Sequence, residues 1–352
     1  MLAFFPSSFR FPLFGSLARL SPSLSRLFLR IPPLSFRQNH CFFPHFCYNK
    51  NRTLVPVYGR RGEIVSDSYE AFLLEQGGEL ACLRFFFHCR WPSGYACPQC
   101  GFREAYTIAT RRMPLFECTR CHYQTSVTSG TFLEGTRTPL SKWLYAMHRL
   151  SDPSSGINAV QLTQLIRVTY KTAYAMLDKI RQSLLSTESD LRSGSLSGSI
   201  EAGLAIWGRE KLSSLELGDH EQPVAAGVAC DSAGQPVQIA LMEVSRSEML
   251  DRTMTPMGCH RFKSRFVSPD PASQKTTVYR SKYLTKRHCK TLASICKAGF
   301  KRIQDTYHGV SLRNLGKYLA EFTFRWNALR KDGQCLRHMA VACLSSRLPV
   351  HA

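Results

Sequence analysis

The chain is poor in acidic residues. Its 352 residues include 25 Asp and Glu against 46 Lys and Arg, which gives a formal net charge of +21. The first 62 residues contain nine of these cations and no acid, and the remaining residues still keep a net charge of +12. A surplus of this size attracts polyanions, and nucleic acid is the commonest polyanionic partner of proteins.

Long apolar runs are also missing. No apolar stretch reaches the roughly 18 residues that a membrane span needs, so no membrane partner is expected. Residues 1–62 contain seven prolines in their first 60 positions, which argues against a long helix there. Three interpretations of this segment remain open: an organellar transit peptide, a degenerate signal sequence, or translated non-coding sequence ahead of the true start. Each of them predicts disorder or loose packing.

The 14 cysteines show no pattern of a disulfide scaffold. Ten of them are scattered, which favours free thiols in a reducing compartment: Cys41, Cys47, Cys82, Cys89, Cys230, Cys259, Cys289, Cys296, Cys335 and Cys343.

The other four cysteines form two CxxC pairs, Cys97 with Cys100 and Cys118 with Cys121, separated by 17 residues. This spacing predicts a zinc ribbon with four thiolate ligands. The segment is too short to bury a core of its own, so the bound metal would supply folding free energy. Four thiolates leave no open coordination position, which predicts a structural Zn²⁺ ion and not a catalytic one.

The pattern predicts helices on either side of the ribbon. We expect residues 63–135 to form a helical lead-in and the ribbon, and residues 136–192 to form a helical segment. A break at residues 168–170 divides this segment into two helices with a helix-turn-helix-like layout. The first turn of the second helix would expose Lys171, Thr172 and Tyr174, where a recognition helix contacts DNA. A plain helical hairpin fits the same pattern equally well.

The second half of the chain has a different pattern. A linker rich in Ser and Gly at residues 193–198 precedes short apolar runs that predict strands. An amphipathic helix is expected from residue 311 onward, followed by a C-terminal tail over residues 331–352. The fold class predicted for the whole chain is a multidomain α+β protein.

Several segments resemble bacterial insertion-sequence transposases that begin with a zinc ribbon. These are the ribbon with its preceding Arg90-Trp-Pro-Ser-Gly, residues 129–143, residues 171–181, and residues 306–327 with their closing Glu-Phe-x-Phe-Arg-x-Asn motif. The resemblance covers residues 66–330. It implies that residues 199–330 form a ribonuclease-H-like domain of the DDE type, in which two divalent metal ions drive strand cleavage and transfer. It also implies double-stranded DNA as the partner, a homo-oligomer on that DNA, and a place in the bacterial cytoplasm in association with the nucleoid.

The metal-binding positions depart from this family. Carboxylates are implied on a central strand, on a second strand and on a later helix. Gly203 stands at the position of the first Asp, although Glu201 and Gly208 beside it align with the family. Before the final helix, Lys290 and Ala293 replace an Asn and a Glu. Because Mg²⁺ needs hard oxygen ligands, we expect it to bind only if the catalytic site is intact.

The second acid of the family has no clear counterpart. Asp251 and Asp270 are the nearest upstream acids, and neither follows a strand and precedes a glycine. A shifted alignment would leave Glu201, Asp231 or Asp251 as possible ligands. Three functions therefore stay open: an active transposase, a DNA-binding protein without catalysis, and a zinc-ribbon module that binds another protein.

Overall fold

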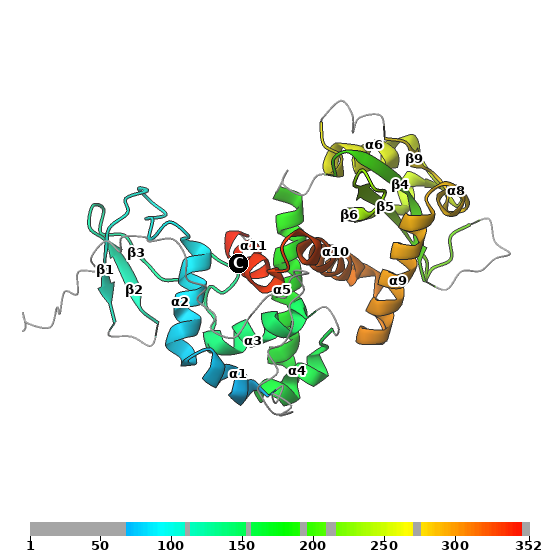
Figure 1. Ribbon diagram of the computed structural model, residues 1–352. Coiled ribbons are helices and arrows are strands. Elements are labelled where there is room, and N and C mark those ends of the chain that lie inside the picture. The colour runs from blue at the N-terminus through cyan, green and yellow to red at the C-terminus, as the bar shows by residue number, and fades with distance from the viewer. Residues whose placement is uncertain are drawn as a thin grey trace, which may run out of the picture.

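The computed structural model describes residues 68–109, 113–152, 156–190, 196–208, 216–269 and 276–346. The predicted disorder of residues 1–62 falls outside these ranges. The ribbon and most helices lie on one side of the molecule, and a four-stranded sheet lies on the other, with α10 between them (Figure 1). None of the described helices is long and apolar enough to span a membrane.

The first half begins with two helices that lead into the ribbon. Ser68 caps the first helix through its hydroxyl, which accepts a hydrogen bond from the Ala71 N–H. The Glu79 carboxylate accepts the N–H groups of Leu140 and Ser141, so it caps a helix 60 residues further along the chain. The elements are α1 (Tyr69–Glu75), α2 (Gly78–Arg90), β1 (Ala105–Ile108), β2 (Leu115–Cys118), β3 (Gln124–Thr125), α3 (Leu140–Ser151), α4 (Ala159–Ile166) and α5 (Tyr170–Asp190).

These elements share one hydrophobic core. Buried side chains of α2 and α3, such as Phe86 and Leu144, belong to the same cluster as Phe116 of the ribbon and Ile180 of α5. The predicted division between residues 63–135 and 136–192 therefore does not correspond to two separately packed modules. The ribbon is an extension of the helical core.

The second half is built on a mixed sheet of strand order β6-β5-β4-β9. The strands β4 (Ser199–Trp207), β5 (Gln222–Cys230) and β6 (Pro236–Glu243) are antiparallel, and β9 (Val278–Tyr279) pairs with β4 in parallel. The short apolar runs of the sequence predicted strands in this half but gave no sign of β9, because two residues are too few to show periodicity.

Helices cover both faces of this sheet. On one face, Phe262 and Phe266 of α6 (Pro256–Phe266) pack against alternate residues of β4. On the other, α9 (Lys290–Tyr307) and α10 (Leu315–Lys331) pack against the remaining ones, with Leu292 and Leu319 fully buried. The short α8 (Lys282–His288) connects β9 to α9.

The C-terminal residues correct a second prediction. Instead of a tail over residues 331–352, the structure has α11 (Cys335–Ser345), which lies against α2, α3 and α5. Met339 and Cys343 of this helix are fully buried in the core of the first half. The sheet and its helices are thus inserted between α5 and α11.

Candidate metal centre and nucleic-acid interface

The two CxxC pairs form matching turns at one end of the ribbon. In each turn the residue after the second cysteine donates its N–H to the carbonyl of the first: Gly101 to Cys97 at 2.9 Å, and His122 to Cys118 at 3.0 Å. Both Gly101 and His122 have positive φ angles, 72° and 57°, which glycine adopts freely and histidine at some cost.

The four thiols converge. The Sγ atoms of Cys97 and Cys121 are 3.5 Å apart, those of Cys100 and Cys118 are 3.6 Å apart, and all four lie within 4.8 Å of one another. A tetrahedron of Zn–S bonds of about 2.3 Å has edges of roughly 3.8 Å, so the donor set fits zinc. It is the only cluster of three or more potential metal-binding side chains among the described residues.

The pKa values of these thiols indicate that a bound cation would stabilise the four thiolates together. Burial disfavours the Cys97 thiolate, but the backbone of Cys100 and Gln99 outweighs burial and lowers its pKa to about 6. The backbone of Tyr123 favours the Cys121 thiolate, yet burial and the neighbouring thiols raise its pKa to about 12. Crowded thiolates repel one another, and a dication removes this repulsion.

Aromatic side chains attach the ribbon to α2. The rings of Trp91 and Tyr95 are 5.2 Å apart, and Phe116 of β2 lies 5.7 Å from Trp91. Arg90 covers the Trp91 ring at 4.7 Å and donates to the carbonyls of Ser126 and Val127 beyond the ribbon. The ribbon is therefore fixed at both its entry and its exit.

The helices α4 and α5 form the expected pair with a tight turn. Asn158 caps α4 with a capping box, and Arg167 ends it at a φ of 50°. The Thr169 hydroxyl accepts the Thr172 N–H at 3.3 Å, so Thr169 caps α5.

The three predicted contact residues of this turn differ in accessibility. Lys171 and Tyr174 are exposed, whereas Thr172 is half-buried with its hydroxyl 2.9 Å from that of Thr169. Tyr170, which the sequence pattern did not indicate as a contact residue, is 57% exposed and lies beside Tyr174.

Two of the positions that the resemblance implies, Gly203 and Lys290, belong to elements that lie side by side. Gly203 lies in β4 opposite Tyr279 of β9, and the start of α9 is close to the same strand, since the Cys289 thiol lies 3.8 Å from the Ala202 carbonyl. Gly203 has no room for a side chain. A Cβ atom there would lie 2.8 Å from Cγ2 of Thr285 and closer still to its hydroxyl, which accepts the Leu204 N–H.

Acids are also absent just after β9 and at the start of α9. The strand β9 is followed by Arg280, Ser281 and Lys282, and α9 begins with an exposed Lys290. Asp251, suggested by a shifted alignment, is exposed at the tip of the hairpin between β7 (Met249–Leu250) and β8 (Thr253–Met254). Asp270 lies outside the described residues.

Two other acids are closer to the sheet. Asp231 caps the β5–β6 turn by accepting the N–H groups of Ala233 and Gln235. Glu201 lies two residues before Gly203, hence on the same face, and its Oε2 is buried without a hydrogen-bond partner. Its charge adds to burial in raising the pKa of the nearby Cys289 thiol to about 11.

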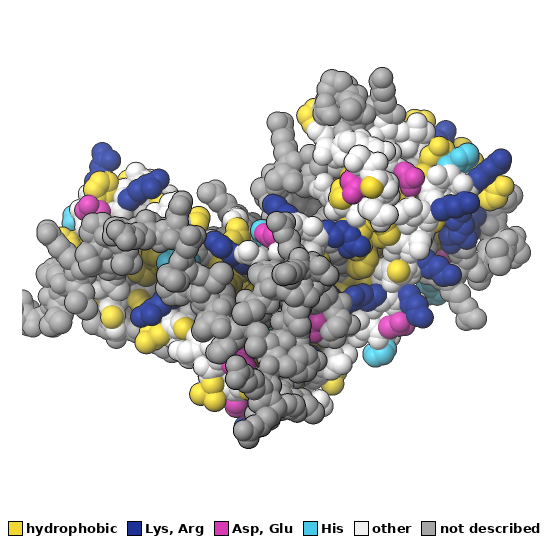
Figure 2. Space-filling model, in the orientation of Figure 1, with side chains coloured by type: hydrophobic (Ala, Val, Ile, Leu, Met, Phe, Trp, Pro, Cys, Tyr) yellow, Lys and Arg dark blue, Asp and Glu magenta, His cyan; other side chains and the backbone are white. Residues whose placement is uncertain are grey.

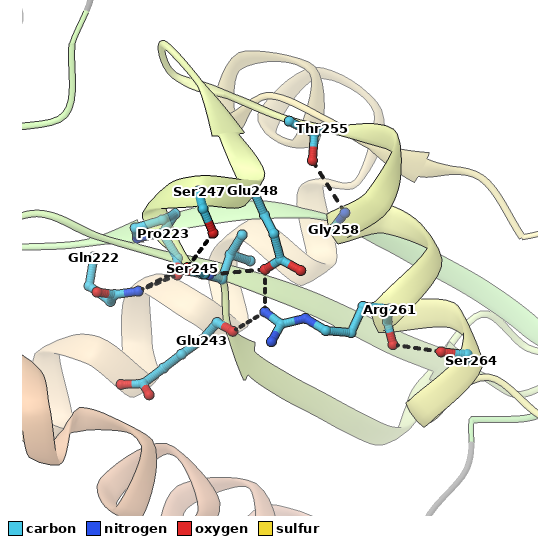
Figure 3. Close-up of polar contacts among 11 residues, drawn as sticks. Gln222, Pro223, Glu243, Ser245, Ser247, Glu248, Thr255, Gly258, Arg261 and Ser264 are labelled. Atoms are coloured by element: carbon cyan, nitrogen blue, oxygen red, sulfur yellow. Dashed lines mark hydrogen bonds and ion pairs between the residues drawn. The ribbon is translucent and has the colours of Figure 1, made fainter.

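Two other carboxylates near the ends of β5 and β6, those of Glu248 and Glu221, have structural bonds. Glu248 accepts the N–H of Ser245 at 3.1 Å and pairs with Arg261 of α6, which also donates to the carbonyl of Glu243 (Figure 3). The Glu243 carboxylate points away from this pair (Figure 3), and burial raises its pKa. Glu221 is bound by both terminal nitrogens of Arg252 at 2.8 and 3.1 Å.

One buried network was not predicted. The Glu321 carboxylate of α10 accepts Nε of Arg181 at 2.7 Å, the Tyr307 hydroxyl at 2.7 Å and Nη1 of Arg325 at 3.2 Å. The Arg181 guanidinium of α5 lies over the rings of both Tyr307 and Tyr318, 4.7 and 4.4 Å from their centres, and these two rings are also in contact with each other. The i, i+4 pair Glu321 and Arg325 was visible in the sequence, but its partner Arg181 was not.

Comparison with known proteins bears on the ribbon. No curated protein and no solved structure matches the chain. Residues 77–124 match the model of a transposase zinc-ribbon domain. This range contains all of α2 and the ribbon with its four cysteines, up to the first residue of β3. This part of the chain is therefore related to the zinc ribbons of transposases.

Proposed function

We propose that the protein derives from an insertion-sequence transposase and binds double-stranded DNA without cleaving it. The match of the ribbon to a transposase zinc-ribbon domain, together with its four convergent thiols, carries this proposal. The net charge of +21 and the exposed Tyr170, Lys171 and Tyr174 on the first turn of α5 support a DNA partner.

The loss of catalysis belongs to the same proposal. In the proposed ribonuclease-H-like domain, Gly203 in β4 and Lys290 at the start of α9 would take the places of two ligands, and neither supplies a carboxylate. Glu201 beside the Cys289 thiol does not provide the oxygen ligands that hold a pair of Mg²⁺ ions.

Assembly and location complete the proposal. The family resemblance favours a homo-oligomer on the ends of a mobile element, in the bacterial cytoplasm and associated with the nucleoid. A protein-binding ribbon is the second candidate function, because zinc ribbons of this size also serve as docking modules.

Fluorescence anisotropy with a labelled DNA duplex at increasing salt tests the binding. We expect salt-sensitive binding, and Lys171→Ala should reduce the slope of log K against log salt by about 1 for one lost phosphate contact. Lys179→Ala is the matched control, because Lys179 lies two turns further along the same helix, and it should leave the slope unchanged. Absence of duplex binding at low salt would leave the docking module as the function.

Cleavage is tested separately with Mg²⁺ or Mn²⁺ on DNA that carries terminal inverted repeats. We expect no strand cleavage. Cleavage that Glu201→Gln abolishes would show that the metal site persists around Glu201, and would refute the loss of catalysis without affecting the DNA-binding proposal.

A further inference from the structure

The segment that runs from the turn of the β7–β8 hairpin into α9 has a large excess of basic over acidic residues. Residues 252–302 contain thirteen Lys and Arg but only one acid, Asp270. This stretch includes α8, the connection to α9 and most of α9 itself. The excess therefore belongs to one region of the sheet domain and does not arise from scattered surface charges.

The fold places much of this charge on one exposed surface. Lys290, Lys297 and Lys301 of α9 are exposed, and their spacing of seven and four residues puts them on one face of the helix over roughly 16 Å. Lys286 and Arg287 of α8 are exposed next to the start of this row. Figure 2 shows Lys and Arg side chains gathered over α8 and α9.

Within the described part of the chain, no acid pairs with these side chains. Lys286, Arg287, Lys290, Lys297 and Lys301 have no ion pair there, whereas Arg252, Arg261 and Lys317 are paired with Glu221, Glu248 and Asp178. Neither α8 nor α9 has an acid in its first turn. Unpaired lysines in a row repel one another, so their placement destabilises the free protein unless an anion compensates for it.

We propose that the α8–α9 surface, formed by Lys286, Arg287, Lys290, Lys297 and Lys301, binds the phosphate backbone of double-stranded DNA. The row begins at Lys290, where the family has a metal-binding side chain. Lysine cations here would take over the charge neutralisation that divalent ions provide in an active site. Duplex DNA is the partner that fits, because its phosphates present a continuous line of negative charge along a rigid surface.

This inference rests on the proposed DNA-binding function. It adds a DNA contact in the second half of the chain, whereas the ribbon and α5 belong to the first half. The surface has one exposed aromatic side chain, Tyr283, at 70% exposure. Successive single-stranded bases stack on several aromatic rings, so a single tyrosine in a row of lysines favours duplex over single-stranded nucleic acid.

The test uses the full chain with lysines 290, 297 and 301 changed together to glutamine. In the anisotropy titration we expect the slope of log K against log salt to fall by about 3, because about one counterion is released for each lost phosphate contact. The matched control changes the same three positions to arginine, which retains the charge, and should bind with the wild-type slope. Because all three side chains are exposed, thermal unfolding should show that neither variant is less stable than the wild type, and the glutamine variant should be slightly more stable because the repulsion is gone.

The outcomes separate this inference from the function on which it rests. Wild-type protein that does not bind duplex DNA refutes the proposed function. Wild-type protein that binds, with an unchanged slope in the glutamine variant, overturns the α8–α9 surface alone. A competition experiment with RNA of the same length as the DNA duplex supplies the last comparison. If the protein binds RNA more tightly than duplex DNA, and the glutamine variant loses only RNA binding, the α8–α9 surface binds RNA and the inference is wrong.

Discussion

At the residue scale, Gly203 lets β4 pack directly against α8. Because Gly203 has no side chain, β4 contacts Thr285 of α8, whose hydroxyl accepts the Leu204 N–H at 2.8 Å. The family resemblance implies an acid at position 203, but the sequence could not show that a helix occupies the space where its side chain would lie. That contact joins positions 82 residues apart and follows no periodicity. An acid at this position would therefore require the helix to move.

We expect Gly203→Ala to lower the free energy of unfolding by about 1 to 3 kcal/mol, because the added methyl group overpacks against Thr285. Thr285→Ala alone should destabilise by about 1 kcal/mol through the lost hydrogen bond to the Leu204 N–H. The double variant should be less destabilised than the sum of the two, since the methyl group then occupies vacated space. Urea unfolding of the four proteins measures this coupling, and strictly additive effects would contradict the contact.

At the scale of elements, the ribbon was predictable and α11 was not. The CxxC spacing of the four cysteines predicts the two metal-binding turns directly, because a backbone hydrogen bond within each turn brings its two cysteines together. The apolar side chains of α11, such as Leu336, Met339 and Cys343, recur at helical spacing, yet nothing in this pattern says which core they enter. Only the packing against α2, α3 and α5 decides that the chain returns to its first half.

Removal of the metal should unfold the ribbon. We expect one zinc ion per chain, and Cys118→Ser or a chelator should release it and change the near-ultraviolet circular dichroism of Trp91 and Tyr95. Cys230→Ser is the control, because Cys230 lies outside the thiol cluster, and it should retain the zinc. A full complement of zinc in Cys118→Ser would mean that Cys118 is not a ligand.

The burial of α11 predicts a large effect from one side chain. Met339 is 0% exposed, so Met339→Ala should reduce the free energy of unfolding by about 2 to 5 kcal/mol. Arg337→Ala, on the exposed side of the same helix, should change it by about 0.5 kcal/mol or less. Chemical denaturation followed by tryptophan fluorescence measures both, and equal effects would place α11 on the surface.

At the scale of the whole molecule, the two halves meet at α5 and α10. The Lys317–Asp178 pair at 2.8 Å and the network around Glu321 join these helices. Burial disfavours the Glu321 carboxylate, but Arg181 and Arg325 outweigh burial and lower its pKa. A carboxylate whose pKa is lower in the folded protein stabilises the fold above its ordinary pKa, about 4.5, and this stabilisation is lost as pH falls through the folded value.

We therefore expect the wild-type protein to lose stability more steeply than Glu321→Gln as the pH falls below about 5. At neutral pH the variant itself should be less stable by about 3 to 5 kcal/mol, because Arg181 would remain buried without its counterion. Urea midpoints at several pH values measure the difference. Parallel pH profiles of the two proteins would show that Glu321 is not ionised in the fold.

The return of α11 to the first half also governs the order of events during synthesis. The end of α5 leaves the ribosome some 145 residues before α11 does, and α2 and α3 leave it earlier still. At 5 to 20 residues per second, the apolar face of α5 waits for roughly 7 to 30 s, and those of α2 and α3 wait longer. A nascent chain stalled after Lys331 should accordingly be open to proteases around α2 and α3, whereas the released protein is protected there. The half of the molecule that is translated first is thus the last to be completed.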